Sequence, residues 1–238
     1  MVFAIIPCRM GSSRFPGKVV ESINEQPMFA HVYNAVVGCP WVDGVCVATD
    51  HFAVWEACYV GGIPCVMTPE RATGSDRVYS AAALLGLKRG IVLNVQGDEP
   101  LITHRHIRQV LTLMEDRPEV NVTTLAYKLT QEQVESEDVV KVLFDGTGRI
   151  CGFSRQQPLD AGVYYGAVGI MGFRIWALAE FARMEQTEGE KATNIELQRL
   201  IDNDFPVHCA VTDIPTIGVD RPEDIGRVER VLNEKQVR

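Results

Sequence analysis

The sequence predicts an α/β protein with a mostly parallel sheet and helices on its faces. Short apolar runs alternate with amphipathic stretches over most of the 238 residues, which is the pattern of strands joined by helical crossovers. Gly and Pro occur at ordinary frequency and punctuate these runs. We interpret residues 1–238 as a single domain, because no repeat, low-complexity segment or interdomain linker interrupts the pattern.

The amino-terminal half is expected to follow a β-α-β-α-β order. Strands are predicted over residues 2–7, 44–48, 64–67 and 91–95, with helices over 27–37, 52–60 and 78–85. The first helix has a proline at its entry and carries Met28, Val32 and Val36 on one apolar face. Residues 73–77 are interpreted as a polar turn before the third helix.

The middle of the chain predicts antiparallel strands. Thr103 is a candidate cap for a helix ending at Glu115, and a strand is expected over 121–127. Residues 139–144 and 149–153 flank an Asp-Gly-Thr-Gly turn signal, and a further strand is predicted over 163–173. We therefore expect an antiparallel insert at about residues 139–190. The remaining predicted elements are helices over 175–184, 194–201 and 222–233, and a strand over 206–211.

The composition excludes several classes of partner and location. A formal net charge of −8 provides no positive field for nucleic acid or for an anionic membrane. No apolar run reaches the roughly 18 residues of a membrane span, and the opening segment is interpreted as a buried strand rather than a signal peptide. Seven scattered cysteines are interpreted as reduced thiols. We expect a cytoplasmic protein without nucleic-acid or membrane partners.

Residues 5–18, directly after the first strand, are the segment most informative about function. They place the cations Arg9, Arg14 and Lys18 among Gly11, Ser12, Ser13 and Gly17. Backbone N–H groups, hydroxyls and positive charge can converge there on one polyphosphate. The segment is neither a P-loop nor a Gly-x-Gly-x-x-Gly motif. A solvated basic turn is the alternative, but the carboxyl end of a strand is where open α/β sheets bind ligands.

Two aspartates at the ends of apolar segments are candidate Mg²⁺ ligands. Asp98 lies in residues 92–100, an apolar strand that ends in Asp98 and Glu99, and Asp220 lies in residues 217–225. An Asx-turn before Pro100 is the alternative for Asp98, and a helix N-cap is the alternative for Asp220. In the turn at 73–77, Asp76 could equally be a helix cap and Arg77 a surface charge. The histidine spacing argues against zinc, and no nucleophile elbow suggests covalent hydrolase chemistry.

Taken in order, seven segments resemble the CMP-sugar-acid synthetases. They are residues 6–18, 47–50 (Val-Ala-Thr-Asp), 74–77 (Gly-Ser-Asp-Arg), 94–100 (Asn-Val-Gln-Gly-Asp-Glu-Pro), 140–145, 153–155 and 219–225. The resemblance implies a glycosyltransferase-A-like nucleotidyltransferase with a three-layer α/β/α sandwich, often a dimer. It also implies transfer of CMP from CTP to an acidic acceptor, with release of pyrophosphate.

Residue by residue, the resemblance implies a nucleotide site, a Mg²⁺ site and a catalytic set. The nucleotide-binding positions are Arg9, Gly11, Ser12, Ser13, Arg14, Lys18, Ser75, Arg77 and Gln96. Asp98 and Asp220 match the Mg²⁺-binding aspartates, and Arg9, Lys18 and Asp98 form the catalytic set. The implied reaction is an in-line attack on the α-phosphorus of CTP without a covalent enzyme intermediate.

Three departures concern the acceptor. The branch of the family that activates 3-deoxy-manno-octulosonate (KDO) has a histidine where this chain has Ala167, and a glutamine where it has Leu197. The stretch after Arg155 is also shorter and carries no further cation. A pocket that loses hydrogen-bond donors rejects its former ligand. The candidate acceptor-binding residues are Lys141, Arg155, Gln156 and Glu196.

The sequence therefore predicts a Mg²⁺-dependent cytidylyltransferase, working as a homodimer, whose acceptor is KDO or a related sugar acid. One alternative is CMP transfer to a small phosphonate such as phosphonoformate in natural-product biosynthesis. A second alternative is a non-catalytic CTP-binding regulator, against which the presence of both Asp98 and Asp220 argues. A glycosyltransferase is disfavoured because residues 98–100 do not form an Asp-x-Asp motif.

Overall fold

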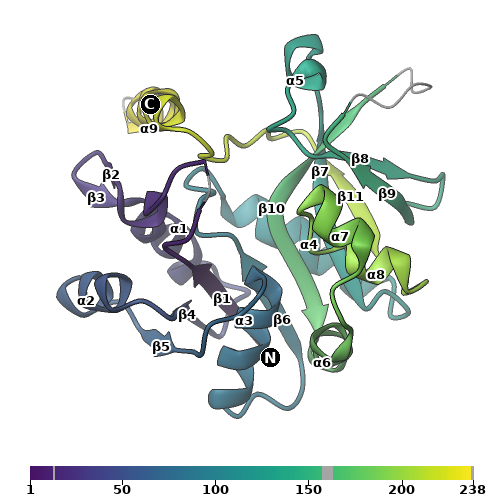
Figure 1. Ribbon diagram of the computed structural model, residues 1–238, viewed down its shortest axis with the longest axis horizontal. Coiled ribbons are helices and arrows are strands. Elements are labelled where there is room, and N and C mark those ends of the chain that lie inside the picture. Colours follow the sequence, from purple (N-terminus) through teal and green to yellow (C-terminus); the bar gives the residue numbers. More distant parts are fainter. Residues whose placement is uncertain (13, 157–162, 237–238) are drawn as a thin grey trace. The chain divides into compact units, whose positions relative to one another are not determined.

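The computed structural model describes residues 1–12, 14–156 and 163–236 (Figure 1). The chain divides into two compact units. The first unit comprises Met1–His104 and Thr216–Arg238, and the second comprises Arg105–Pro215. Ser13, a predicted phosphate-binding residue, lies outside the described residues.

Four parallel strands form the centre of the first unit. They are β1 (Val2–Cys8), β4 (Gly44–Thr49), β5 (Cys65–Met67) and β6 (Ile91–Val95). β1 pairs with β4 and β6, and β4 also pairs with β5. Each strand is nearly continuous in apolar residues because helices cover both faces of a parallel sheet. The predicted β-α-β-α-β order is confirmed.

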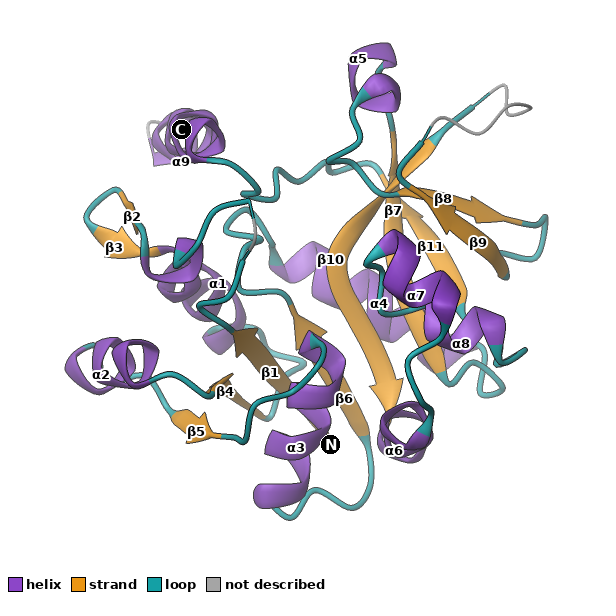
Figure 2. Ribbon diagram, viewed as in Figure 1, coloured by secondary structure: helices purple, strands orange, loops and turns teal. Residues whose placement is uncertain are grey.

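Helices α1 (Met28–Val37), α2 (Phe52–Val60) and α3 (Gly74–Leu84) connect these strands (Figure 2). α1 and α2 lead from β1 through β4 to β5, whereas α3 leads back from β5 to β6 and packs against all four strands. Because such crossovers are right-handed, the reversal of direction puts α3 on the opposite face from α1 and α2. The first unit is thus layered as α/β/α.

The start of α3 corrects the turn predicted at residues 73–77. The Thr73 hydroxyl accepts a hydrogen bond from the Asp76 N–H at 3.2 Å and donates to the Asp76 carboxylate at 2.7 Å. Thr73 is therefore the N-cap, and the helix begins at Gly74, four residues before the predicted start. Asp76 lies in the first turn, so the alternative that it is the cap of this helix is wrong.

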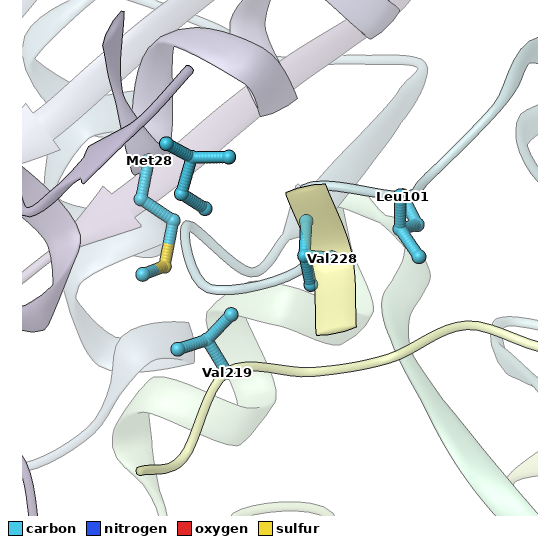
Figure 3. Packing of buried hydrophobic residues seen from close by; sticks show 5 residues of the cluster. Met28, Leu101, Val219 and Val228 are labelled. Carbon is cyan, nitrogen blue, oxygen red and sulfur yellow. The ribbon is translucent and has the colours of Figure 1, made fainter. Parts of the chain in front are cut away.

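The carboxyl-terminal helix α9 (Pro222–Gln236) also belongs to the first unit. It contacts β2 (Ser22–Ile23), which pairs with β3 (Gln26–Pro27) after the short helix η1 (Lys18–Val20). A buried cluster packs these segments together (Figure 3). Its members are Ile23, Met28, Leu101, Val219 and Val228. Burying such side chains contributes roughly 1.5–3 kcal/mol each, which fixes the residues leading into α9.

Antiparallel pairing characterises the second unit. Its strands are β7 (Val122–Lys128), β8 (Lys141–Phe144), β9 (Ile150–Ser154), β10 (Tyr165–Arg174) and β11 (His208–Thr212). β10 is antiparallel to β7 and β8, β8 is antiparallel to β9, and β11 is parallel to β7. The predicted hairpin around residues 145–148 is confirmed. The acceptor and dimer roles expected for residues 139–190 stay predictions.

The helices of the second unit are α4 (His104–Asp116), which begins at the last residue of the first unit's leading segment, α5 (Gln131–Glu135), α6 (Ile175–Arg183), α7 (Glu188–Thr193) and α8 (Gln198–Asp202). Side chains cap two of them, since Thr130 and Thr187 accept hydrogen bonds from N–H groups in the first turns of α5 and α7. The helix predicted over 194–201 begins later than expected, at Gln198 of α8, because Asn194 adopts a left-handed conformation with φ 55° and ends α7. α5 and α7 were not predicted.

The sequence led us to expect reduced cysteines and no membrane-spanning segment. All seven cysteines are free thiols, of which five are buried, Cys65 is half-buried and Cys151 is exposed. In residues 1–12, 14–156 and 163–236, no helix combines the length and apolar character that crossing a membrane requires.

Candidate functional site

The loop after β1 turns the chain so that Lys18 becomes buried. The N–H groups of Ser12 and Gly17 both donate to the Met10 carbonyl, at 3.0 and 2.9 Å. Gly17 has φ +75°, a conformation that glycine adopts without steric cost, and it leads directly into η1. Lys18 is consequently only 7% exposed, whereas Arg9 at the start of the loop is exposed.

Asp98 reaches the same edge of the sheet from β6. Since β6 is parallel to β1, the segments that follow these strands emerge side by side. A Cβ on Gly97 would lie 2.8 Å from the Cys8 sulfur and 3.2 Å from the Pro7 carbonyl oxygen. Because Gly97 has no side chain, the backbone can pass close to the end of β1. This close approach places Asp98 beside the end of β1.

The Lys18 ammonium joins the two predicted metal ligands. Its Nζ lies 2.6 Å from Asp98 Oδ2 and 3.0 Å from Asp220 Oδ1. The Val219 carbonyl accepts a third hydrogen bond from Nζ at 2.7 Å. Arg14 Nη2 contacts Asp220 Oδ1 at 2.8 Å. Four candidates from three distant segments of the chain thus form one ion cluster in the first unit.

Asp220 is held for this contact by the start of α9. The backbone N–H groups of Asp220 and Arg221 both donate to the Asp224 carboxylate at 3.0 Å. Asp224 therefore binds the N–H groups at the helix start, and the Asp220 carboxylate binds Arg14 and Lys18 instead of capping. The Val219 N–H also donates to the Asp98 carbonyl at 2.9 Å, which ties the two aspartate segments together.

The electrostatic environment keeps Lys18 charged. Burial is the largest single influence and lowers the pKa of its ammonium, but the charges and hydrogen bonds of Asp98 and Asp220 together outweigh it. The pKa of Lys18 is therefore raised above its ordinary value. At neutral pH a positive charge is present between the two carboxylates.

The carboxylate pair fits a divalent cation by its donor chemistry. Mg²⁺ prefers oxygen ligands and is usually held by one or two carboxylates together with water and substrate phosphates. The Asp98 and Asp220 side chains are 30% and 26% exposed, so both are accessible, and both already contact a cationic group. Among the described residues no cluster of three or more His, Cys, Asp and Glu side chains forms a metal site. Any further ligands of Mg²⁺ would therefore be water molecules or substrate phosphates rather than additional His, Cys, Asp or Glu side chains.

Arg77, predicted to lie near the nucleotide, is buried in an ion pair. Its Nη2 contacts Asp50 Oδ2 at 2.6 Å, and its Nη1 donates to the Thr68 hydroxyl at 2.8 Å. The alternative that Arg77 is a surface charge is wrong, since the side chain is only 2% exposed. Asp50 was not singled out from the sequence. Its position directly after the apolar strand β4 is the signal that could have identified it.

Ser75 and Gln96 belong to a polar network between α3 and β6. The Asn94 amide donates to the Ser75 hydroxyl at 3.0 Å, and the Gln96 amide donates to Asn94 Oδ1 at 3.3 Å. Ser75 and Asn94 are fully buried, whereas Gln96 is half-buried. This network orients Gln96 at the same strand end that precedes Asp98.

The acceptor candidates lie in the second unit, where they contact mainly backbone. The Lys141 ammonium donates to the carbonyls of Ser136 at 2.5 Å and Arg155 at 2.8 Å. Arg155 donates from Nε to the Thr193 carbonyl at 2.8 Å. Burial lowers the pKa of Lys141, and the nearby Arg155 lowers it further. Both cations therefore brace loops in the structure.

The other two acceptor candidates are more accessible. Gln156 is exposed, and its backbone N–H donates to the Ser154 hydroxyl at 3.1 Å. Glu196 is half-buried in the segment between α7 and α8. The acceptor assignments of Lys141, Arg155, Gln156 and Glu196 stay predictions.

Comparison with known proteins defines the family. The family model described as cytidylyltransferase matches residues 3–206. This chain belongs to the cytidylyltransferase family. The matched region includes the loop after β1, Asp98 and the antiparallel strands of the second unit, and it ends before Asp220.

Relatives of this cytidylyltransferase extend the match to nearly its full length. The 3-deoxy-manno-octulosonate cytidylyltransferase of Oleidesulfovibrio alaskensis is 36% identical, over 98% of this chain and 97% of the relative. That of Nitratidesulfovibrio vulgaris (strain DP4) is 38% identical, over 98% and 96%. A solved CMP:2-keto-3-deoxy-manno-octonic acid synthetase, complexed with CTP, matches with a TM-score of 0.88 at 29% identity, covering 98% of this chain and 99% of that chain. The predicted α/β nucleotidyltransferase fold is confirmed.

Proposed function

We propose that this cytidylyltransferase transfers CMP from CTP to KDO, and that Arg14, Lys18, Asp98 and Asp220 form the centre of its nucleotide site. The observation that carries the proposal is the ion cluster, in which two cationic side chains and two carboxylates meet at the carboxyl ends of parallel strands. The names of the curated relatives support KDO as the acceptor, and the solved relative complexed with CTP supports the nucleotide.

The reaction transfers a cytidylyl group in one displacement. A hydroxyl oxygen of KDO forms a bond to the α-phosphorus of CTP, and the bond from that phosphorus to the oxygen bridging the α- and β-phosphates breaks. Pyrophosphate leaves with the bonding electrons, and the hydroxyl proton is released to solvent or to a base. Negative charge develops on the leaving group, so fixed positive charge beside it accelerates the step.

The residues of this chain have distinct parts in the proposal. Arg9 is exposed and Arg14 is partly exposed at the loop after β1, so their guanidinium groups can reach phosphate oxygens. Lys18 supplies a charge that persists at neutral pH. Asp98 and Asp220 would hold Mg²⁺. A bound Mg²⁺ supplies charge neutralisation on the phosphate oxygens.

The sugar acid is the acceptor that we propose in preference to a phosphonate. The relatives named for KDO support it despite Ala167 and Leu197. Ala167 is half-buried in β10, opposite Ala126 of β7, and its N–H donates to the Val140 carbonyl at 2.8 Å. Ala167 therefore contributes to strand pairing through its backbone. Lys141, Arg155, Gln156 and Glu196 are the residues that we propose for contact with the acceptor.

We also propose that the chain acts as a homodimer in the cytoplasm. The resemblance to a family that is often dimeric supports the assembly, and the free thiols, one of them exposed at Cys151, support a reducing compartment. Light scattering of the purified chain tests the assembly, and a mass of twice 26.4 kDa is expected.

Pyrophosphate release with CTP and Mg²⁺ tests the proposed reaction. Separate reactions would contain KDO, phosphonoformate or no acceptor. Release that depends on KDO is expected. Pyrophosphate release with phosphonoformate but not with KDO would replace the proposed acceptor. CTP binding without pyrophosphate release in the presence of either acceptor would favour a non-catalytic CTP-binding regulator.

A further inference from the structure

The Lys18 ammonium uses its whole hydrogen-bonding capacity inside the protein. An ammonium group has three N–H donors and no acceptor. Its three partners are Asp98 Oδ2, Asp220 Oδ1 and the Val219 carbonyl, at 2.6, 3.0 and 2.7 Å. Lys18 therefore has no donor left for a phosphate while these contacts persist.

The same contacts place Lys18 against the proposed metal ligands. A divalent cation on the Asp98 and Asp220 oxygens would lie next to a buried ammonium, and like charges at such distances repel strongly where water is excluded. Displacement of the ammonium would be a rotation of the side chain, because backbone hydrogen bonds hold residue 18 itself. Its N–H donates to the Phe15 carbonyl at 3.2 Å, and its carbonyl accepts from the Glu21 N–H at 3.1 Å.

We infer that Lys18 is an internal counter-ion that keeps the divalent cation off the Asp98–Asp220 pair until a triphosphate draws its ammonium away. The inference rests on the proposed function, since it takes Mg²⁺ and CTP as the ligands. Before metal and nucleotide bind, Lys18 and Arg14 neutralise the two carboxylates, and the buried ammonium has carboxylate partners.

One consequence is that metal and nucleotide bind cooperatively. The phosphates offer the displaced ammonium new anionic partners, and the vacated carboxylates offer the metal its ligands. CTP then increases the affinity for metal, and by linkage the metal increases the affinity for CTP by the same factor. Lys18 is thus a positioning residue that couples the two ligands, in addition to its proposed contact with phosphate.

Metal binding without nucleotide tests the competition directly. The probe is Mn²⁺, titrated into the full chain and followed by electron paramagnetic resonance of free Mn²⁺. Lys18→Met removes the charge with little change in side-chain length, and Lys88→Met is the matched control at an exposed position. We expect Lys18→Met to bind Mn²⁺ about tenfold more tightly than wild type or more, which corresponds to about 1.4 kcal/mol. Lys88→Met should match wild type. Equal or weaker binding by Lys18→Met overturns the inference.

A second variant and a second readout protect the test against loss of folding. Lys18→Gln keeps a donor for the Val219 carbonyl but has no charge, and it should show the same direction of change in Mn²⁺ affinity. Mg²⁺ should also raise the melting temperature of both Lys18 variants more than that of wild type, because the ion replaces the missing counter-charge. A smaller rise in both Lys18 variants than in wild type contradicts the inference.

The nucleotide arm tests the cooperativity. CTP should increase the Mn²⁺ affinity of wild type by a larger factor than that of Lys18→Met, after correction for Mn²⁺ bound by free CTP. Equal factors overturn the coupling role of Lys18. If wild type releases no pyrophosphate, the proposed function fails, but the Mn²⁺ titration without CTP still tests whether Lys18 competes with the metal. Conversely, an active wild type whose Lys18→Met variant gains no metal affinity keeps the proposed function and loses this inference.

Discussion

The two units each bury a lysine, and the partners of the two ammonium groups differ. Lys18 in the first unit and Lys141 in the second are 7% and 1% exposed. Lys18 contacts two carboxylates, which raise its pKa despite burial. Lys141 donates to two backbone carbonyls, and burial lowers its pKa. One lysine therefore belongs to a charged site, and the other stabilises loop structure.

The difference shows what a buried cation can do in each place. An ammonium between carboxylates can be exchanged for another cation, because the carboxylates stay accessible and keep their charge. An ammonium on carbonyls cannot leave without depriving partly buried backbone acceptors of their donor. Resemblance to the family predicted a site role for both lysines, and the contacts favour that role at Lys18 most strongly.

Asp98→Asn is expected to have the largest effect. Loss of a proposed Mg²⁺ ligand weakens the hold on the ion that would neutralise charge developing on the phosphates, so pyrophosphate release should fall by about 10²–10³-fold, the scale for removing one such electrostatic stabilisation. The melting temperature should change little. Asp213→Asn, at an exposed aspartate of the second unit, is the matched control. A rate for Asp98→Asn within twofold of the control would remove Asp98 from the site.

Lys141→Met should act on stability rather than on nucleotide binding. It leaves the Ser136 and Arg155 carbonyls without their donor, and because these acceptors are only partly buried the cost should be about 1 kcal/mol, the low end of the range for an unsatisfied acceptor. Urea unfolding should therefore show a lower free energy of unfolding, with CTP affinity unchanged. Full stability of the Lys141→Met variant would break the comparison, whereas lower turnover with KDO together with lower stability agrees with the proposed acceptor contact.

Arg14→Ala should weaken CTP binding by about tenfold, at the low end of the range for a charge-assisted hydrogen bond. Arg14 is partly exposed, so solvent screens its charge and limits the effect. Calorimetric titration of CTP measures it, with Arg105→Ala as the control at a more exposed arginine. Unchanged CTP affinity would show that the phosphates do not reach this side of the loop.

The pH dependence of the free energy of unfolding should show the smallest effect. It distinguishes the two lysines because their pKa values are shifted in opposite directions. Because the folded pKa of Lys141 is below its ordinary value of 10.5, the unfolded chain binds its proton more readily between those two pH values. Stability therefore rises with pH in this window, and Lys141→Met lacks the rise. Urea unfolding from pH 8 to pH 11 should show the difference between wild type and variant widening as pH increases. A difference that is constant or narrows contradicts the lowered pKa.

Much of the fold was predictable because apolar periodicity follows directly from burial. The parallel strands of the first unit and the hairpin at residues 145–148 match their predicted positions. Helix ends were predicted less well where a cap decided them. Thr73 begins α3 before the apolar pattern starts, and the left-handed Asn194 divides a stretch whose composition suits one helix.

The site was predictable as a set of residues but not as a set of contacts. Arg14, Lys18 and Asp98 were candidates because they follow apolar strands, and the family resemblance implied that Asp220 joins Asp98 at a Mg²⁺ site; the structure brings all four together. No local pattern could show that Lys18 contacts both aspartates, because those segments lie 80 or more positions away in the sequence. The pairing of Arg77 with Asp50, which are 27 positions apart, was also missed because no local pattern links them.

Identification of the product tests the central claim most directly. Wild type and Asp98→Asn would be incubated with CTP, Mg²⁺ and KDO, and the products followed by phosphorus magnetic resonance. The account predicts one phosphodiester of CMP and KDO and one pyrophosphate for each CTP consumed by wild type, with neither detectable at matched times for the variant. CTP that stays intact in the presence of KDO and wild type, or equal product from both proteins, would contradict it.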